Sequence, residues 1–265
     1  MIYQFDNIPN FRGLGGYTMQ DGRTVRKGRL LRGGYLGDAS DNDIRRLSEE
    51  FDVKHVFDFR SDMERQIKPD REIPGAKATW LPTIDMYTDQ QVEMLPHDAY
   101  IDLEGFLIRE CFTDKVKYLA RTMYPSMIDN EYTQLQYAAF IQNIINTPYG
   151  AIYWHCSQGK DRTGLGAAFL LFALGADRET VVKDFDLSND FYREEIDRTC
   201  KVVIEKGGGE EECDAVRSFL GVGTRNFEYT LDKIDADYGG IMPFIQNMLM
   251  VGDEDIEVLR ERYLE

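Results

Sequence analysis

The chain has 265 residues, of which 43% are hydrophobic and 29% charged, and its formal net charge is −16. This length and composition are typical of a globular protein with a sizeable core, and no run approaches the roughly 18 consecutive apolar residues that a membrane span needs. The negative charge disfavours nucleic acid and anionic membrane as partners, so an anionic ligand would need a local positive site.

The amino-terminal residues Met1 to Asp6 contain neither the basic segment nor the apolar run of a secretory signal. We therefore expect a cytoplasmic protein without a stable membrane anchor. The four cysteines form no CxxC pair, and the chain has three histidines, so neither a zinc site nor another cofactor is expected. Free thiols in a reducing compartment are the simpler interpretation. These cysteines are Cys111, Cys156, Cys200 and Cys213.

Apolar runs and helical patterns alternate along the chain. A capping box of Ser40 and Asp43 begins one helix, residues 135–145 form an amphipathic helix, and residues 163–174 form a nearly all-apolar helix that Gly175 ends. Buried strands are predicted at residues 53–59, 78–81 and 151–154. The alternation predicts an α/β fold with a mostly parallel central sheet and helices on both of its faces.

The remaining segments are expected to be helical or exposed. Residues 86–128 are too many for a simple strand connection, and we expect a helical insertion that could act as a lid. Residues 205–213 predict an exposed loop, and residues 225–265 predict a tail of two or three helices with a break at Gly239-Gly240. Because no repeat or low-complexity linker interrupts the chain, we expect one domain over residues 1–265.

The segment 155–164 carries the chemistry. A buried strand ends at Trp154, a short polar loop follows, and a helix begins near Arg162. This arrangement aims backbone N–H groups and a helix N-terminus at one point, which makes an anion site. Cys156 opens the loop, where the helix end and nearby cations lower the pKa of its thiol. Arg162, six positions later, can hold two phosphate oxygens with its planar guanidinium.

We expect the Cys156 thiolate to attack phosphorus in line and give a phosphocysteine that water then hydrolyses. Arg162 and the loop amides would stabilise charge on the equatorial oxygens. Thr163 could hydrogen-bond the sulfur, and His155 would order the loop. Lys160 either adds affinity for a second phosphate or pairs with Asp161. The residues that supply the loop amides are Ser157, Gln158, Gly159, Lys160 and Asp161.

These residues resemble the phosphate loop of the protein tyrosine phosphatases, in particular the bacterial and fungal branch that carries HCxxGKDRTG. Residues 10–17, with Arg12, resemble its NxRDLGG motif, and residues 31–34 resemble LxRSG. Residues 56–61, with Asp58 and Arg60, resemble DLRS. The resemblance runs from residue 10 to about 190, and the tail fits as well.

The resemblance implies a cysteine-phosphatase-like fold, no metal, and activity on phosphotyrosine. Some relatives also accept phosphoserine, phosphothreonine or phosphoinositides, so the expected partner is a phosphorylated protein or a phosphoinositide. The chain departs from the family at Gly13, where Asp is usual, and at Gly33, where Ser is frequent. Both lie outside the phosphate loop, so they bear on substrate contacts more than on the reaction.

Phosphate release also needs an acid near the leaving oxygen. The chain has no Trp-Pro-Asp tripeptide, and three aspartates are candidates. Asp161 lies in the loop, Asp58 ends a strand at the edge where α/β sites gather, and Asp85 follows Trp80-Leu81-Pro82. The resemblance favours Asp161 first and Asp58 second. Asp58 could instead be a salt-bridge partner of Arg60.

Two other functions compete with the phosphatase. A catalytically silent phosphate-binding pseudophosphatase would keep the loop without the reaction, and a sulfurtransferase would also place a cysteine on a strand–loop–helix turn. A run of basic residues could line the substrate mouth or form a solvated hairpin. This run consists of Arg23, Arg26, Lys27, Arg29 and Arg32.

Overall fold

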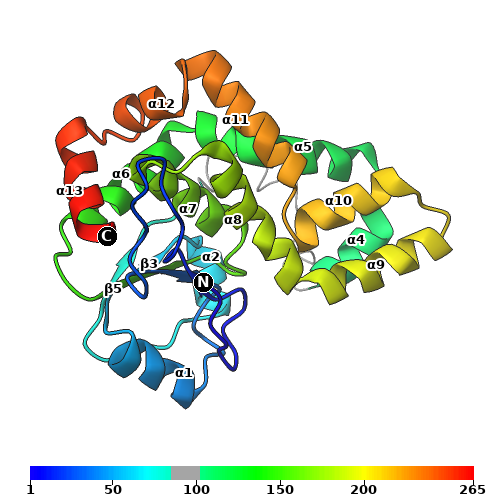
Figure 1. The fold of residues 1–265 in the computed structure, drawn as a ribbon. Helices are drawn as coiled ribbons and strands as arrows, with labels where there is room; N and C mark the ends of the chain where they lie inside the picture. Colours follow the sequence, from blue (N-terminus) through cyan, green and yellow to red (C-terminus); the bar gives the residue numbers. More distant parts are fainter. Residues whose placement is uncertain (85–101) are drawn as a thin grey trace.

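A five-stranded sheet forms the centre of the computed structural model, which describes residues 1–84 and 102–265 (Figure 1). The strand order is β1-β2-β5-β3-β4. Only β1 runs antiparallel to its neighbour, so the predicted mostly parallel sheet is confirmed. The strands are β1 Arg12–Gly13, β2 Leu30–Gly33, β3 Val53–Asp58, β4 Lys77–Trp80 and β5 Ala151–His155. β1 and β2 are too short for hydrophobic periodicity to predict them.

Helices follow or separate the strands. The first part of the chain contributes α1 Asp41–Arg45, the π-helical turn η1 Arg46–Glu50, and α2 Asp62–Ile67. The middle contributes α4 Leu103–Glu110, α5 Asp114–Asp129, α6 Glu131–Ile145, α7 Asp161–Leu174, α8 Arg178–Phe191, α9 Arg193–Glu205 and α10 Glu210–Leu220. The tail consists of α11 Thr224–Tyr238, α12 Ile241–Asn247 and α13 Asp253–Tyr263. Among these described helices, none has the length and apolar character required to cross a bilayer.

Helices cover both faces of the sheet, as predicted. Successive residues of β5 point to opposite faces, and Tyr153 and Trp154 accordingly belong to two different hydrophobic clusters. The cluster of Trp154 is the larger and contains side chains of α5 to α8 and of the tail helices. The cluster of Tyr153 packs against α1 and η1 on the other face. In Figure 1, α1 lies below the sheet, and α6, α7 and α13 lie above it.

A third cluster holds α4, α9 and α10 against one end of α5, and these helices form the lobe at the right of Figure 1. Its buried residues include Leu107, Cys111, Leu119, Cys200 and Val216. The expected helical insertion is thus present over residues 103–129. Asp85 and the first part of the predicted lid, residues 86–101, lie outside the described residues.

Helix ends agree with the sequence patterns at most positions. The capping box of Ser40 and Asp43 is formed, and α7 and α11 end at Gly175 and Gly239, both with positive φ. The predicted loop over residues 205–213 is wrong, because α9 continues to Glu205 and α10 begins at Glu210. Three glutamates occupy the first turn of α10, where their negative charges interact favourably with the helix dipole and stabilise the helix.

Candidate active site

A pocket of about 470 Å³ opens at the carboxyl end of β5. β5 ends at His155, α7 begins at Asp161, and the loop between them starts with Cys156. The pocket is lined by Cys156 and by five further residues of this segment: Ser157, Gln158, Lys160, Asp161 and Arg162. Gly159, within this loop, has φ of 68°, and a Cβ there would come within 2.2 Å of the Gly33 carbonyl. The close approach of β2 therefore requires glycine at this position.

The Cys156 side chain is buried and lines the pocket. Burial alone would raise the pKa of the thiol, but the Arg162 guanidinium and the neighbouring Thr163 outweigh it, so the pKa lies below its ordinary value. Among the described residues the buried Thr163 hydroxyl has no hydrogen-bond partner, so its proton is available to the sulfur or to a ligand. The site therefore favours a thiolate at Cys156.

Glu64 binds Arg162 and was not predicted as a site residue. Its two carboxylate oxygens accept from Nη1 and Nη2 of Arg162 at 2.7 Å each, and one also accepts from the Ser157 hydroxyl. Burial would raise the pKa of this carboxyl, but Arg162 and Ser157 lower it to about 2. Glu64 is the third residue of α2, where it forms a capping box with Ser61. The same cap therefore holds the carboxylate against Arg162.

Asp161, the preferred candidate acid, lines the pocket from the first turn of α7. Its Oδ1 accepts a hydrogen bond from the hydroxyl of Tyr124 at 2.7 Å. Burial raises the pKa of this carboxyl although Lys160, Tyr124 and Arg162 act against it. A raised pKa keeps the proton that a general acid must donate.

Lys160 lines the pocket, and its ammonium is held by contacts within the protein. It donates to the backbone carbonyl of Phe219 on α10, lies 5.7 Å from the centre of the Tyr192 ring, and is 3.9 Å from Asp161 Oδ2. The side chain is 4% exposed, and burial lowers its pKa. Of the two roles considered for Lys160, these contacts match pairing within the protein.

Asp58 does not line the pocket. Its carboxylate accepts from Nε and Nη2 of Arg60 at 2.9 and 2.8 Å, and Arg65 lies 3.2 Å away. Both oxygens are thus engaged with arginines behind the loop. The geometry matches the alternative in which Asp58 is the salt-bridge partner of Arg60, and it gives Asp58 no access to a leaving group.

Asp58 and Arg60 instead surround His155, together with Asp70. Nε2 of His155 lies 3.3 Å from Asp70 Oδ2, and Nδ1 lies 3.1 Å from the Cys156 carbonyl oxygen. Burial would lower the pKa of His155, but the two carboxylates raise it. One side-chain oxygen of Asp58, one of Asp70 and one ring nitrogen of His155 lie within 4.8 Å of one another. Arg60 already bridges the two carboxylates, so a cation there would have to displace a buried guanidinium.

Arg12 lies beneath the loop in a buried network with Asp184 and Arg32. Asp184, on α8, accepts from Arg12 Nε at 3.2 Å and from Arg32 Nη1 at 2.7 Å. Arg32 also donates to the carbonyls of Gly159 and Lys160 at 2.9 and 3.1 Å. Two arginines from the N-terminal motifs therefore fix the loop from behind through one carboxylate.

Asn10 completes this support by donating to the Gly159 carbonyl at 2.8 Å. Gly13 and Gly33, where the chain departs from the family, are absent from the pocket lining.

The run of basic residues between Arg23 and Arg32 does not line the pocket in the described residues either. Arg26 and Arg29 donate to the carbonyls of Leu264 and Gly150, and Arg32 is buried.

The outer wall of the pocket is apolar. Residues from α2, α4, α5 and α10 approach the loop and leave space above Cys156 for an apolar or aromatic group. They include Met63, Ile67, Leu103, Met123, Met127 and Phe219.

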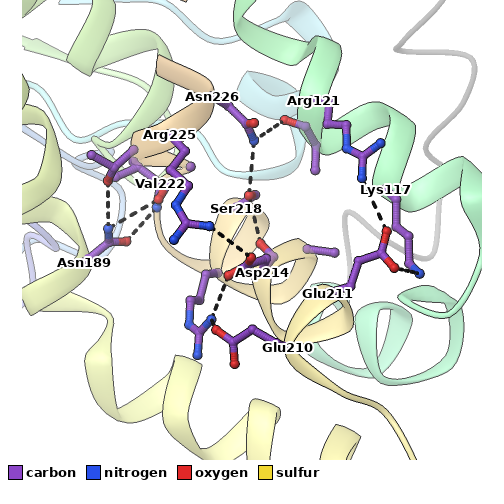
Figure 2. Close-up of a pocket in the computed structure, with 15 residues that line it drawn as sticks. Lys117, Arg121, Asn189, Glu210, Glu211, Asp214, Ser218, Val222, Arg225 and Asn226 are labelled. Carbon is purple, nitrogen blue, oxygen red and sulfur yellow. Dashed lines mark hydrogen bonds and ion pairs between the residues drawn. The ribbon is translucent and has the colours of Figure 1, made fainter. Parts of the chain in front are cut away.

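A second pocket, of about 350 Å³, lies between α5, α10 and the start of α11 (Figure 2). Its charged side chains pair with one another: Lys117 with Glu211 at 3.1 Å, and Arg217 with Asp214 at 2.8 Å. Gly223 lines this pocket and donates its N–H to the Tyr124 hydroxyl at 3.3 Å. Two hydrogen bonds to the Tyr124 hydroxyl thus link Gly223, which lines this pocket, to Asp161, which lines the first.

The comparisons with known proteins agree with this site. A family model described as the tyrosine phosphatase family matches residues 3–265. A Cupriavidus necator protein named as a tyrosine-protein phosphatase is 28% identical over 98% of this chain and 87% of its own length. The triple specificity protein phosphatase PtpB of Mycobacterium tuberculosis is 26% identical over 87% of each chain. A tyrosine-protein phosphatase of Nostoc commune is 25% identical over 78% of this chain and 74% of its own length.

Two solved structures are also similar. The structure of P. aeruginosa TpbA covers 75% of this chain and 89% of its own, with 16% identity and a TM-score of 0.35. The structure of PTPMT1 in complex with PI(5)P covers 83% of this chain and 97% of its own, with 12% identity and a TM-score of 0.31.

Proposed function

This chain belongs to the tyrosine phosphatase family, and we propose that it hydrolyses aryl phosphomonoesters, phosphotyrosine above all, through a phosphocysteine on Cys156. The observation that carries this proposal is the position of the Cys156 thiol. It is buried, it lines the pocket beside Arg162, and the Arg162 guanidinium and Thr163 lower its pKa. A thiolate at this position is a strong nucleophile.

In the first step, the Cys156 sulfur attacks phosphorus, an S–P bond forms, and the bond from phosphorus to the tyrosine oxygen breaks. Asp161 gives its proton to that oxygen. Arg162 and the loop amides stabilise the equatorial oxygens while charge shifts from sulfur to the leaving group. Arg162 can do so while bound to Glu64, because its Nε and the second hydrogens of its Nη atoms are not used by that carboxylate.

In the second step, water attacks phosphorus on the side that the tyrosine has left. Asp161, now ionised, takes a proton from this water, the S–P bond breaks, and inorganic phosphate leaves. The Thr163 hydroxyl can donate to the departing sulfur, which stabilises the returning thiolate. The four residues then return to their starting protonation states. No metal ion is needed for either step of this proposal.

The substrate class follows from the pocket wall. An aromatic ring on the phosphate would contact the apolar side chains above Cys156, including Met123, Met127 and Phe219. Lys160 is engaged with Phe219 and Asp161, which leaves its ammonium without a role in binding a second phosphate. Phosphotyrosine therefore fits this site better than a substrate with adjacent phosphates. The matches to a triple specificity phosphatase and to a lipid-bound structure keep phosphoserine, phosphothreonine and phosphoinositides as secondary substrates to assay.

We further propose that residues 1–265 act as one catalytic domain, which the match of the family model to residues 3–265 supports. A lid over residues 86–128 remains a proposal. Leu103, Met123 and Met127 of this stretch line the pocket. Hydrogen exchange over this stretch with and without orthovanadate would test it: protection on binding is expected for a lid, and unchanged exchange would contradict one.

The function is tested by hydrolysis of p-nitrophenyl phosphate with EDTA present, comparing the wild type with Cys156→Ser. We expect turnover in the wild type and none above background in the variant, with both proteins folded by circular dichroism. Cys200→Ser, a buried cysteine outside the pocket, is the matched control and is expected to retain activity. Inactivity of folded, reduced wild type would instead favour the phosphate-binding pseudophosphatase.

A further inference from the structure

We infer that Tyr124 is a positioning residue that directs the proton-carrying oxygen of Asp161 toward the leaving group. This inference rests on the proposed function, in which Asp161 is the general acid. Tyr124 lies on α5, 37 residues before Asp161, and it does not line the pocket. Its role would therefore be exerted through Asp161 and not through the substrate.

The Tyr124 hydroxyl is held from two sides. It donates to Asp161 Oδ1 at 2.7 Å and accepts from the backbone N–H of Gly223 at 3.3 Å. Because the Gly223 N–H can only donate, the tyrosine proton is left for Asp161. The hydrogen bond to the carboxylate thus has a defined direction.

The ring of Tyr124 is fixed as well. It is fully buried and packs edge-on against Phe185 and Phe227, with ring centres 5.4 and 6.4 Å away. The start of α11, which carries Gly223, is attached to α5 by a second contact: Asn226 Nδ2 donates to the Ala120 carbonyl at 2.8 Å (Figure 2). The phenol therefore has little freedom to follow a rotation of Asp161.

These contacts distinguish the two oxygens of Asp161. Oδ1 is occupied by Tyr124, whereas Oδ2 lies 3.9 Å from Lys160 Nζ, beyond hydrogen-bond distance. Oδ2 is therefore the oxygen left to carry the proton into the pocket that Asp161 lines. Without this contact the carboxyl could rotate and turn either oxygen, or neither, toward the substrate. A general acid that is out of position contributes less to the rate of leaving-group departure. The hydrogen bond also stabilises the ionised form that must take a proton from water in the second step.

Other ionisable groups near Asp161 also shift the pKa of its carboxyl. The cations Lys160 and Arg162 favour the carboxylate, whereas burial and the neighbouring Cys156 thiolate favour the protonated acid. The phenols of Tyr137 and Tyr192 face it from α6 and from the end of α8, and burial keeps both protonated. Tyr124 differs from these two phenols because its hydroxyl donates directly to Asp161, and Tyr124→Phe removes that oxygen while the ring remains.

The test compares wild type with Tyr124→Phe on aryl phosphates of graded leaving-group pKa. We expect the loss of kcat to be small for p-nitrophenyl phosphate and to grow as the leaving group becomes more basic, because only basic leaving groups need the acid. Loss of a donor to the carboxylate also raises the pKa of Asp161. The descending limb of the pH profile of kcat/KM should therefore move to higher pH. The expected shift is roughly half a pH unit to one unit, which corresponds to the free energy of one lost hydrogen bond.

Tyr118→Phe, on the exposed side of the same helix, is the matched control and should behave as wild type. An equal loss of kcat for all leaving groups, with an unmoved limb, would show that Tyr124 is merely structural and would overturn the inference. If Tyr124→Phe does not fold, 2,3-difluorotyrosine at position 124 keeps the ring and strengthens the donor. It should move the limb to lower pH, and an unmoved limb would again contradict the inference.

Asp161→Asn separates this inference from the function on which it rests. If that variant shows no leaving-group dependence beyond wild type, Asp161 is not the acid and the proposed function must be revised. If Asp161→Asn is strongly impaired on basic leaving groups while Tyr124→Phe matches Tyr118→Phe, the acid assignment stands and only the role of Tyr124 is lost.

Discussion

Glu64 and Arg162 form a bidentate ion pair at the wall of the substrate pocket, with both Nη atoms of the guanidinium 2.7 Å from the carboxylate. The pair joins the first turn of α2 to the first turn of α7. Each group on its own would be costly to bury, and the pairing offsets that cost. The guanidinium is thereby held in one orientation before any phosphate arrives.

Glu64→Gln should weaken catalysis. The amide keeps the size of the side chain but loses its charge and one of its two acceptors, so Arg162 would no longer be fixed for phosphate. We expect kcat/KM for p-nitrophenyl phosphate to fall roughly ten- to hundredfold, the size of one lost charged hydrogen bond. Glu72→Gln, at an exposed position in the segment that follows α2, is a suitable control. An increase in activity would instead show that Glu64 competes with phosphate for Arg162.

Acid should destabilise the protein through Glu64 and Asp70. The pKa of each carboxyl is lowered to about 2 in the folded protein, from ordinary values of 4.5 and 3.8. Their stabilisation is therefore fully present above about pH 4.5 and is lost as the pH falls toward 2. For Glu64 the loss is on the order of 3 kcal/mol. Urea unfolding from pH 6 to pH 2 should show this slope, and Glu64→Gln should flatten it; an unchanged slope would contradict the assignment.

Asp184→Asn should destabilise the fold strongly. The change leaves Arg12 and Arg32 without their shared carboxylate in a buried position. We expect the free energy of unfolding to fall by about 3–5 kcal/mol, measured by urea denaturation. Asp190→Asn, on the same helix but in an exposed pair with Arg193, should change it by less than about 1 kcal/mol. Similar losses in the two variants would mean that the buried network does not stabilise the loop.

Lys160→Met should affect substrates with one and with two phosphates by the same factor. The ammonium binds the Phe219 carbonyl and lies near Asp161, so its removal would disturb the loop rather than a second phosphate site. The measurement is kcat/KM for a phosphotyrosine peptide and for a soluble inositol bisphosphate lipid. A loss confined to the bisphosphate would show that Lys160 turns toward the substrate.

The catalytic loop and the core elements could be predicted because their signals are local. The apolar run of β5, the glycine-containing loop and the apolar helix α7 follow one another along the chain, and their order alone places Cys156 beside Arg162. The same holds for the capping box of Ser40 and for the glycine that ends α7. Each depends on residues within a few positions of one another.

The residues that support the loop could not be predicted in this way. Ser61 and Glu64 have the spacing of a capping box, which indicates the start of α2, but the contact of Glu64 with Arg162 spans 98 residues. Tyr124 and Asp184 likewise reach the loop from helices whose positions depend on the whole fold. The position of Asp58 at the end of a strand makes it a candidate acid in the sequence, and only the tertiary structure shows that Arg60 and Arg65 contact its carboxylate.

The predicted loop at residues 205–213 failed for a different reason. Three glycines followed by three glutamates suggest exposed irregular chain, but acidic residues also favour the first turn of a helix. The apolar residues that follow, Cys213, Val216 and Leu220, return at helical spacing and are buried. The helical spacing that begins at Cys213, together with the acidic residues before it, indicates a helix start near Glu210.

The central claim is that the phosphoryl group passes through Cys156, and trapping that intermediate tests it most directly. The enzyme is mixed with excess p-nitrophenyl phosphate, quenched in acid within milliseconds, and digested for mass spectrometry under conditions that preserve thiophosphate esters. We predict one added phosphoryl group on the peptide that contains Cys156, and none in Cys156→Ser. Full turnover with no covalent species, or a phosphoryl group on another residue, would contradict the mechanism.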